Sequence, residues 1–285
     1  MTAPEQPRLS VTLIARDEED RLPSALASVA FADERIVVVD AASTDRTEEI
    51  ASRAGARVLV RPFDGFGRQK NAAAALATNR WILSIDADEI VSPKLALEIR
   101  ACLAAAASET SPPAAFRVPI RLEFLGQELL FGRDTLVRPA RLYDRMRARF
   151  SDDLVHERIL AAGPVESLQE SVLHRSYRDL AHYLEKLDRY TTLAAEAKWA
   201  AGKNGGFLPA RVLWEFFDRA FLRLGFLDGS AGLTFATLST GNTLLKYLKL
   251  RELERAIARG KRVPPEGVKI EDTAALRIRA LHRAR

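Results

Sequence analysis

Short apolar runs alternate with amphipathic stretches over the first third of the chain. The runs are four to seven residues long and rich in Val, Ile and Leu, which is typical of strands buried on both faces; they cover residues 9–15, 35–40, 57–60 and 81–85. The stretches between and after them show helical spacing of apolar positions or helix-start residues, and they cover residues 21–31, 43–54, 68–77 and a segment opened by Pro93. Such alternation predicts an α/β fold, with a mostly parallel sheet flanked by helices.

The pattern changes after residue 113. Residues 116–124 and 136–143 resemble longer strands, whereas 177–201, 209–224 and 231–253 predict a C-terminal helical extension. We therefore expect three parts: a catalytic domain over 1–175, a helical acceptor- or membrane-associating region over 176–260, and a basic, poorly ordered tail over 261–285.

Two aspartates follow the fourth strand directly. In an extended chain, residues i and i+2 point to one side, so Asp86 and Asp88 would present two carboxylates together. Paired carboxylates at the carboxyl end of a parallel strand are hard ligands for Mg²⁺ or Mn²⁺, which can neutralise a departing diphosphate. The alternative is a polar cluster that caps the helix at Pro93.

Three further groups of residues are candidates for chemistry. Asp40 ends the second strand, where an acid can accept hydrogen bonds from a nucleoside, and Lys70 follows two glycines in a segment that can approach a phosphate. The segment 152–157 gathers Asp153, His156 and Glu157, which are candidates for a general base or a metal ligand. Helix capping and a polar turn are the simpler interpretations of the first and last of these groups.

Composition narrows the class of protein. Apolar residues make up 47% and charged residues 28% of 285, which excludes a mostly disordered chain, a collagen and a simple coiled coil. The single cysteine excludes an internal disulfide framework and any zinc site with two or more thiolates. The sequence shows neither a secretory signal nor an apolar run near the roughly 20 residues that a membrane span requires, so a cytoplasmic location is expected.

The positive charge is concentrated near the end of the chain. Residues 251–285 contain ten Lys or Arg and five Asp or Glu, which accounts for the whole net charge of +5. Upstream, Trp214, Phe217 and Phe221 lie at helical spacing on one face of an expected amphipathic helix. An apolar face followed by cations suits one-sided attachment to an anionic membrane surface, although the same face could simply pack on the catalytic domain.

Four motifs, in order, resemble the amino-terminal pattern of family 2 glycosyltransferases: SVTLIARDEEDRLPSALASV, RIVVVDAASTDRTEEIASRAGARV, GFGRQKNAA and WILSIDADEIVS. DDLVHE, HRSYRDLAHYLEKLDRYT and GFLDGSAG are similar to the bacterial subgroup of lipopolysaccharide core β-1,4-glucosyltransferases, so the resemblance spans about residues 8–250. It implies the GT-A fold, a nucleotide-sugar-binding α/β domain.

The resemblance also implies a role for each matching residue. Ala15, Arg16 and Glu18 stand where family members contact the nucleotide. Asp40 stands where an acid binds the base, Lys70 where a cation approaches the diphosphate, and Asp86 and Asp88 at the metal-binding D-x-D. Many members place the base in a Glu-Asp pair that this chain lacks, so Glu157 ranks first and Asp153 second, with His156 a metal or diphosphate ligand.

These residues lead to a specific expectation about function. We expect an inverting, metal-dependent transferase that moves a hexose, expected to be glucose, from a UDP-linked donor to a lipid-linked lipopolysaccharide core or other envelope glycan. It would work on the inner face of the cytoplasmic membrane and bind no nucleic acid. A sugar nucleotidyltransferase is one alternative, but Arg16, Asp17 and Glu18 stand where its Gly-rich phosphate loop should begin. The other is a non-enzymatic basic scaffold or nucleic-acid-binding protein, which would interleave aromatic and basic residues.

Overall fold

The chain forms two compact units. The computed structural model describes residues 7–132, 135–152, 157–201 and 208–259, so the expected basic tail lies outside the described residues. The first unit comprises Met1–Arg121 with Val137–Arg175, and the second comprises Leu122–Leu136 with Ser176–Arg285. Assigning catalysis to one and acceptor or membrane contacts to the other stays a prediction.

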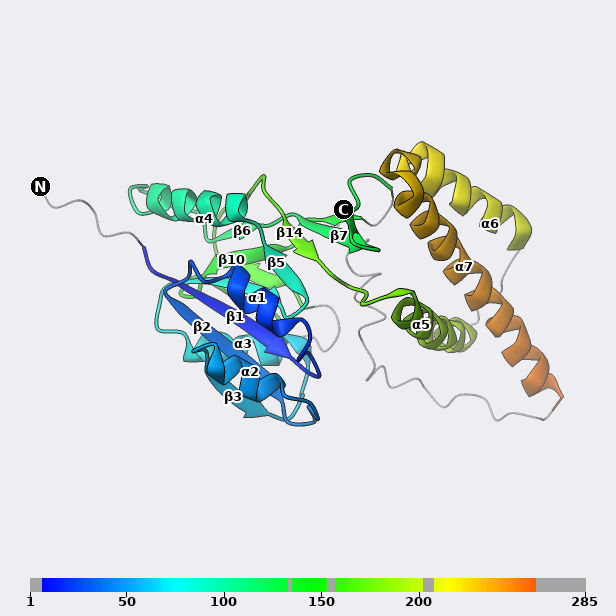
Figure 1. Ribbon diagram of the computed structural model, residues 1–285, viewed down its shortest axis with the longest axis horizontal. Helices are drawn as coiled ribbons and strands as arrows, with labels where there is room; N and C mark the ends of the chain where they lie inside the picture. The colour runs from blue at the N-terminus through cyan, green and yellow to red at the C-terminus, as the bar shows by residue number, and fades with distance from the viewer. Residues whose placement is uncertain (1–6, 133–134, 153–156, 202–207, 260–285) are drawn as a thin grey trace, which may run out of the picture. The chain divides into compact units, whose positions relative to one another are not determined.

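A seven-stranded, mostly parallel sheet forms the centre of the first unit (Figure 1). The strand order is β13-β6-β10-β4-β1-β2-β3, in which β4, β1, β2 and β3 are parallel and β10 runs antiparallel to both neighbours. The strands are β1 (Leu9–Ala15), β2 (Glu34–Asp40), β3 (Arg57–Arg61), β4 (Trp81–Asp86), β6 (Ala115–Arg117), β10 (Ala140–Asp144) and β13 (Val165–Ser167). The predicted α/β fold with a mostly parallel sheet is confirmed.

Both faces of the sheet are covered. Alternate β1 residues, such as Leu9 and Val11, pack in one apolar cluster with side chains of α1 (Leu22–Ser28), α2 (Thr47–Arg53) and α4 (Pro93–Ala106). Ile36, Val38 and Ile82 face the other side, where α3 (Phe66–Leu76) contributes Ala73. Burial on both faces explains why these strands read as nearly continuous apolar runs.

Smaller strands complete the first unit. β5 (Glu89–Val91) pairs antiparallel with β14 (Val172–His174), and β11 (Ala148–Phe150) pairs antiparallel with β12 (Ile159–Ala161). The single strand expected over 116–124 is divided into β6 and β7 (Ile120–Phe124), and β9 (Leu136–Val137) precedes β10. Pro119 lies between the two strands. Proline has no N–H to donate to a neighbouring strand, which explains the break at this position.

Three long helices dominate the second unit. They are α5 (Leu180–Ala200), α6 (Leu208–Phe217) and α7 (Gly229–Ala258); a π-helical turn, η1 (Asp218–Leu222), and a 3₁₀ turn, η2 (Gly225–Asp228), connect α6 to α7 (Figure 1). The helix expected over 209–224 therefore changes type at residue 218. Among the described helices, none is long and apolar enough to cross a bilayer.

A hairpin packs with these helices. It is formed by the end of β7 and β8 (Gln127–Glu128), and the ring of Phe124 contacts those of Tyr177, Tyr183 and Phe235. The Asp228 carboxylate accepts backbone hydrogen bonds from Leu130 and Phe131 at 3.1 and 2.8 Å. These contacts explain why residues 122–136 belong to the second unit.

Candidate active site

The loops that follow β1 and β2 are joined at the carboxyl edge of the sheet. The Asp17 N–H donates to Ser43 Oγ at 2.9 Å, and the Thr44 N–H donates back to the Asp17 carboxylate at 2.8 Å. Asp17 has a φ of 52°, an uncommon conformation for a residue other than glycine. Ser43 therefore connects two loops instead of capping a helix, and α2 begins at Thr47, four residues later than the sequence pattern predicts.

Three residues expected to bind the nucleotide lie at this edge. Ala15 is the last residue of β1 and pairs with Val39, next to Asp40 at the end of β2. Arg16 Nη1 lies 3.5 Å from the buried Asp40 carboxylate, which also accepts the Ala42 N–H at 3.0 Å. The exposed Arg16 side chain leaves this pair open to solvent on one side.

Glu18, the fourth residue expected to bind the nucleotide, pairs with Arg21. Two guanidinium nitrogens of Arg21 donate to the Glu18 carboxylate at 2.6 and 2.8 Å, a bidentate arrangement that fixes both side chains. Arg21 Nη1 also lies 3.5 Å from the Asp88 carboxylate. Glu18 therefore positions a cation beside Asp88.

Asp88 pairs with His174, a residue that the motif analysis did not single out. His174 Nε2 lies 3.2 Å from Asp88 Oδ2 because β14 returns beside β5 with His174 opposite Glu89. Burial opposes ionisation of Asp88, but the charges of His174 and Arg21 outweigh it and hold the pKa of Asp88 well below its usual range. Burial likewise disfavours a charged imidazole, yet the Asp88 carboxylate raises the pKa of His174.

Asp86 belongs to a buried network of alternating charges. Lys70 Nζ lies 3.3 Å from Asp86 Oδ1 and 3.0 Å from Glu157 Oε1, and it stands 5.2 Å from the centre of the Phe150 ring. Arg141 Nη2 contacts Asp86 at 3.0 Å and Glu89 at 3.1 Å. Burial raises the pKa of Glu89 despite the opposing effect of the Arg141 charge.

The two aspartates of the D-x-D segment have different cationic partners. The backbone turns after Asp86, and the Glu89 carboxylate accepts the Asp86 N–H at 2.8 Å. Asp86 contacts Lys70 and Arg141, whereas Asp88 contacts Arg21 and His174. The extended geometry assumed from the sequence therefore does not hold at Asp88.

Gly67 allows α3 to approach the segment that carries Glu157. A Cβ at this position would collide with the Ser151 carbonyl oxygen and come within 3.3 Å of Glu157 Cβ. The Asn71 side chain adds hydrogen bonds to the Phe150 backbone, donating to its carbonyl and accepting its N–H at 3.0 Å each. These contacts hold α3, which carries Lys70, against the segment that carries Glu157.

The donor chemistry at Asp88 fits a divalent cation. Carboxylate oxygens and an imidazole nitrogen are ligands that Mn²⁺ accepts, and carboxylates suit Mg²⁺. In the part of the chain that the structure describes, however, no three His, Cys, Asp or Glu side chains are already gathered around a common point. Asp153 and His156, the other candidates from the sequence, lie outside the described residues.

Comparison with known proteins identifies the family. Residues 10–105, which contain Arg16, Asp40, Lys70, Asp86 and Asp88, match the model for Glycosyl transferase family 2. This part of the chain belongs to glycosyltransferase family 2. A transferase of this family moves sugar from a nucleotide-sugar donor, which counts against both the nucleotidyltransferase and the scaffold alternatives.

Two relatives are similar in sequence over most of this chain. An uncharacterized glycosyltransferase of Rickettsia conorii is 28% identical over 86% of this chain and 90% of its own length. A lipopolysaccharide core biosynthesis glycosyltransferase, LpsC of Rhizobium meliloti, is 29% identical over 85% of this chain and 94% of its own length. Among solved structures, glucosyl-3-phosphoglycerate synthase from Mycobacterium tuberculosis, in complex with Mn²⁺, UDP and glucosyl-3-phosphoglycerate, is 24% identical with a TM-score of 0.31. The likeness covers 42% of this chain and 45% of that one.

Proposed function

We propose that the protein is an inverting hexosyltransferase that moves glucose from a UDP-linked donor to a lipopolysaccharide core or other lipid-linked envelope glycan. The observation that carries the proposal is the Asp86–Asp88 turn at the carboxyl edge of a parallel sheet, where cations and a histidine surround the two carboxylates. The likeness to LpsC over most of both chains supports the class of acceptor.

The nucleotide would bind over the ends of β1 and β2. Asp40 would accept hydrogen bonds from the base, and Ala15 and Arg16 would contact the rest of the nucleoside. Lys70 would compensate the negative charge of the diphosphate, whose arrival would give its ammonium group another anionic neighbour beside Asp86 and Glu157.

A Mg²⁺ or Mn²⁺ ion would be held by Asp88, with help from Asp86. His174, 3.2 Å from Asp88, is a candidate nitrogen ligand beside the expected His156. Such an ion supplies positive charge that stabilises the departing diphosphate. Arg21 and Glu18 hold the Asp88 side chain in place from the other direction.

Transfer needs a base for the acceptor hydroxyl. Glu157 is the first candidate and Asp153 the second: the carboxylate takes the hydroxyl proton while the oxygen attacks the anomeric carbon. The new glycosidic bond forms on the face opposite the departing nucleoside diphosphate, so the configuration at that carbon inverts. The Lys70 ammonium donates to Glu157 Oε1 at 3.0 Å and holds this carboxylate in place.

A lipid-linked acceptor places the reaction at a membrane. We therefore propose that the protein attaches peripherally to the anionic inner face of the cytoplasmic membrane, with no nucleic-acid partner.

A donor screen tests the proposal. Purified protein would be incubated with UDP-, GDP- and dTDP-glucose, with Mn²⁺, Mg²⁺ or a chelator, and release of the free nucleotide would be measured. We expect UDP release that needs the metal and rises with a core-oligosaccharide acceptor. Preference for another donor, or equal turnover in chelator, would contradict the corresponding part of the proposal, and pyrophosphate formation from UTP and glucose 1-phosphate would favour a nucleotidyltransferase.

A further inference from the structure

A run of large apolar side chains is exposed from the second half of α6 to the turn before α7. The exposed fraction ranges from 43% at Leu224 and Phe226 to 70% at Leu213. The other members are Trp214, Phe217, Phe221, Leu222 and Leu227. Eight such residues within fifteen positions form a concentration that a soluble surface rarely carries without a partner.

Four aromatic rings form a continuous row within this run, which we call the aromatic row. Ring centres are separated by 6.2 Å between Trp214 and Phe217, 5.5 Å between Phe217 and Phe221, and 6.1 Å between Phe221 and Phe226. The π-helical turn η1 and the following 3₁₀ turn carry the row past the end of α6. The rings therefore form one continuous surface that spans α6, η1 and η2.

The carboxylates of Glu215 and Asp218, which lie beside this surface, are paired with arginines and largely buried. The Glu215 carboxylate pairs with Arg219 at 2.9 Å, and Asp218 lies 3.6 Å from Arg223; both carboxylate side chains are at most 16% exposed. Arg223 is itself 46% exposed, whereas the Arg211 guanidinium packs over the Tyr247 ring. The row thus presents aromatic rings and the Arg223 guanidinium to its surroundings.

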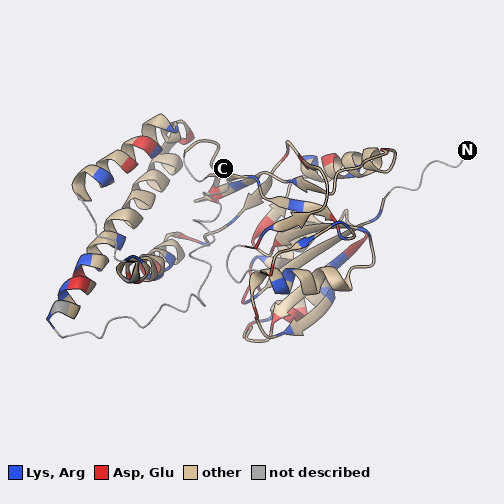
Figure 2. Ribbon diagram, turned by 180° about the vertical axis from the view of Figure 1, so that it is seen from behind, with Lys and Arg blue, Asp and Glu red and all other residues tan. Residues whose placement is uncertain are grey.

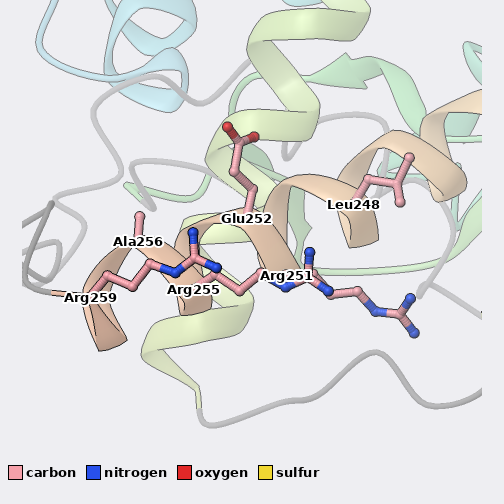
Figure 3. Close-up of a pocket in the computed structure, with 6 residues that line it drawn as sticks. All are labelled: Leu248, Arg251, Glu252, Arg255, Ala256 and Arg259. Atoms are coloured by element: carbon pink, nitrogen blue, oxygen red, sulfur yellow. The ribbon is translucent and has the colours of Figure 1, made fainter.

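The same unit carries a second group of cations. Arg251, Arg255 and Arg259 recur every four residues at the end of α7, where Figure 2 shows cationic and acidic positions together. With Leu248, Glu252 and Ala256 they line a hollow of about 390 Å³ (Figure 3). Phosphate groups are the natural partners of such a row.

We propose that the aromatic row is the membrane-inserting surface, and that its partner is a bilayer with anionic headgroups. Aromatic rings suit the boundary between headgroups and acyl chains, where exposed guanidinium groups can meet lipid phosphates. The charge pattern of the row favours this partner, because an anionic leaflet would be repelled by exposed carboxylates, and in the row Glu215 and Asp218 are paired with arginines. The inference deepens the proposed membrane location, but the surface stands on the exposure of its own residues and not on the identity of the acceptor.

Vesicle sedimentation with the full chain tests the inference. Wild-type protein would be mixed at low salt with vesicles of phosphatidylcholine and phosphatidylglycerol, or of phosphatidylcholine alone. The double variant Phe217→Ser/Phe221→Ser should bind at least about tenfold more weakly, because two rings no longer leave water. The control Leu97→Ser/Met146→Ser removes two even more exposed apolar side chains from the first unit and should bind like wild type.

The cations predict a separate response. Arg251→Gln/Arg255→Gln/Arg259→Gln should weaken binding to anionic vesicles at low salt and leave binding to neutral vesicles unchanged. Quenching of tryptophan emission by brominated lipid gives a measurement that does not depend on destabilising variants. It should report Trp214 at the lipid boundary and should fall in Trp214→Phe.

Three outcomes would overturn the inference. They are wild-type protein that stays in the supernatant with anionic vesicles, equal binding by the phenylalanine variant, and a lipid-free dimer in analytical ultracentrifugation that this variant abolishes. The last result would assign the row to a second copy of the chain. Donor hydrolysis, measured in parallel, separates the two proposals, because vesicle binding without UDP release would reject the proposed activity and leave the membrane surface standing.

Discussion

Two regions of the molecule differ in which side chains they bury. The carboxyl edge of the sheet in the first unit buries charged side chains, whereas the aromatic row of the second unit exposes apolar ones. At the sheet edge, Lys70, Asp86 and Glu89 are almost fully buried. In the aromatic row, Trp214 and its neighbours are exposed while the nearby carboxylates are shielded by arginines. Each region departs from the usual rule that charged residues lie outside and large apolar ones inside.

The two departures have different physical consequences. Burying charges disfavours folding unless each charge has an opposite partner, so the sheet edge holds its carboxylates in defined positions that a charged ligand can use. Exposing aromatic rings disfavours the isolated protein in water and favours association with an apolar surface. Buried charge therefore marks a candidate site for chemistry, and exposed apolar surface marks a candidate site for attachment.

Substitution of the proposed base, Glu157, should give the largest effect on the rate of transfer. Glu157→Gln is nearly isosteric but cannot take a proton at neutral pH, so transfer should fall by about 10²–10⁴-fold while donor affinity survives. Kinetics with acceptor, together with calorimetric titration of UDP, would measure both. If UDP affinity falls and kcat does not, Glu157 positions Lys70 and is no base; if Asp153→Asn loses transfer and Glu157→Gln does not, the ranking of the two is wrong.

Substitution of one tryptophan in each unit compares the core of the first unit with the aromatic row of the second. Trp81 is buried against Phe116 and Trp214 is 62% exposed. Trp81→Ala should lower the free energy of unfolding by about 3–5 kcal/mol, and Trp214→Ala by about 0.5 kcal/mol or less. Urea unfolding followed by circular dichroism would check this difference. A large, concentration-dependent loss in Trp214→Ala would mean that another protein surface covers the aromatic row.

The next largest effect is expected from substitution of Asp88, the proposed metal ligand. Asp88→Asn keeps the shape of the side chain and removes a charged ligand, so metal-dependent turnover should fall by about 10²-fold or more. Asp33→Asn is the matched control, because Asp33 pairs with Arg100 and accepts the Leu9 N–H at the opposite end of β1. Near-normal Mn²⁺-dependent turnover in Asp88→Asn would remove the support for a metal at this turn.

The smallest effect concerns a paired carboxylate far from the candidate site. Burial opposes ionisation of Glu34, but hydrogen bonds from Ser10, Thr78 and Arg57 outweigh it and hold the pKa of Glu34 below its ordinary value of 4.5. The stabilisation is fully present above that value and is lost as the pH falls through the lower pKa of the folded state.

Glu34→Gln should therefore lower the free energy of unfolding by about 1 kcal/mol at pH 7. Urea unfolding at several pH values should show this difference shrinking in acid, where the wild-type carboxyl also becomes protonated. A difference that stays constant from pH 7 down to the acid limit would show that the charge of Glu34 is not responsible.

Much of the first unit can be predicted from local pattern. β1, β2 and β4 follow from short apolar runs, and Asp40 and Asp86 are found because parallel strands bring their carboxyl ends to one edge. Helix starts are less predictable. Ser43 resembles a capping residue, but the structure uses it to join two loops. Asp45 does both, because its carboxylate accepts the N–H of Glu19 in the other loop and the N–H of Thr47, the first residue of α2.

By itself the sequence determined the alternation of strands and helices and the acidic strand ends, because both depend on residues a few positions apart. The tertiary structure decided which distant groups meet them. His174 reaches Asp88 across 86 positions, and Glu157 reaches Lys70 across 87, through strand returns and loops whose register no local pattern specifies. It also decided that the face of α6 containing Trp214 remains exposed, since an amphipathic pattern is the same whether or not a neighbour covers it.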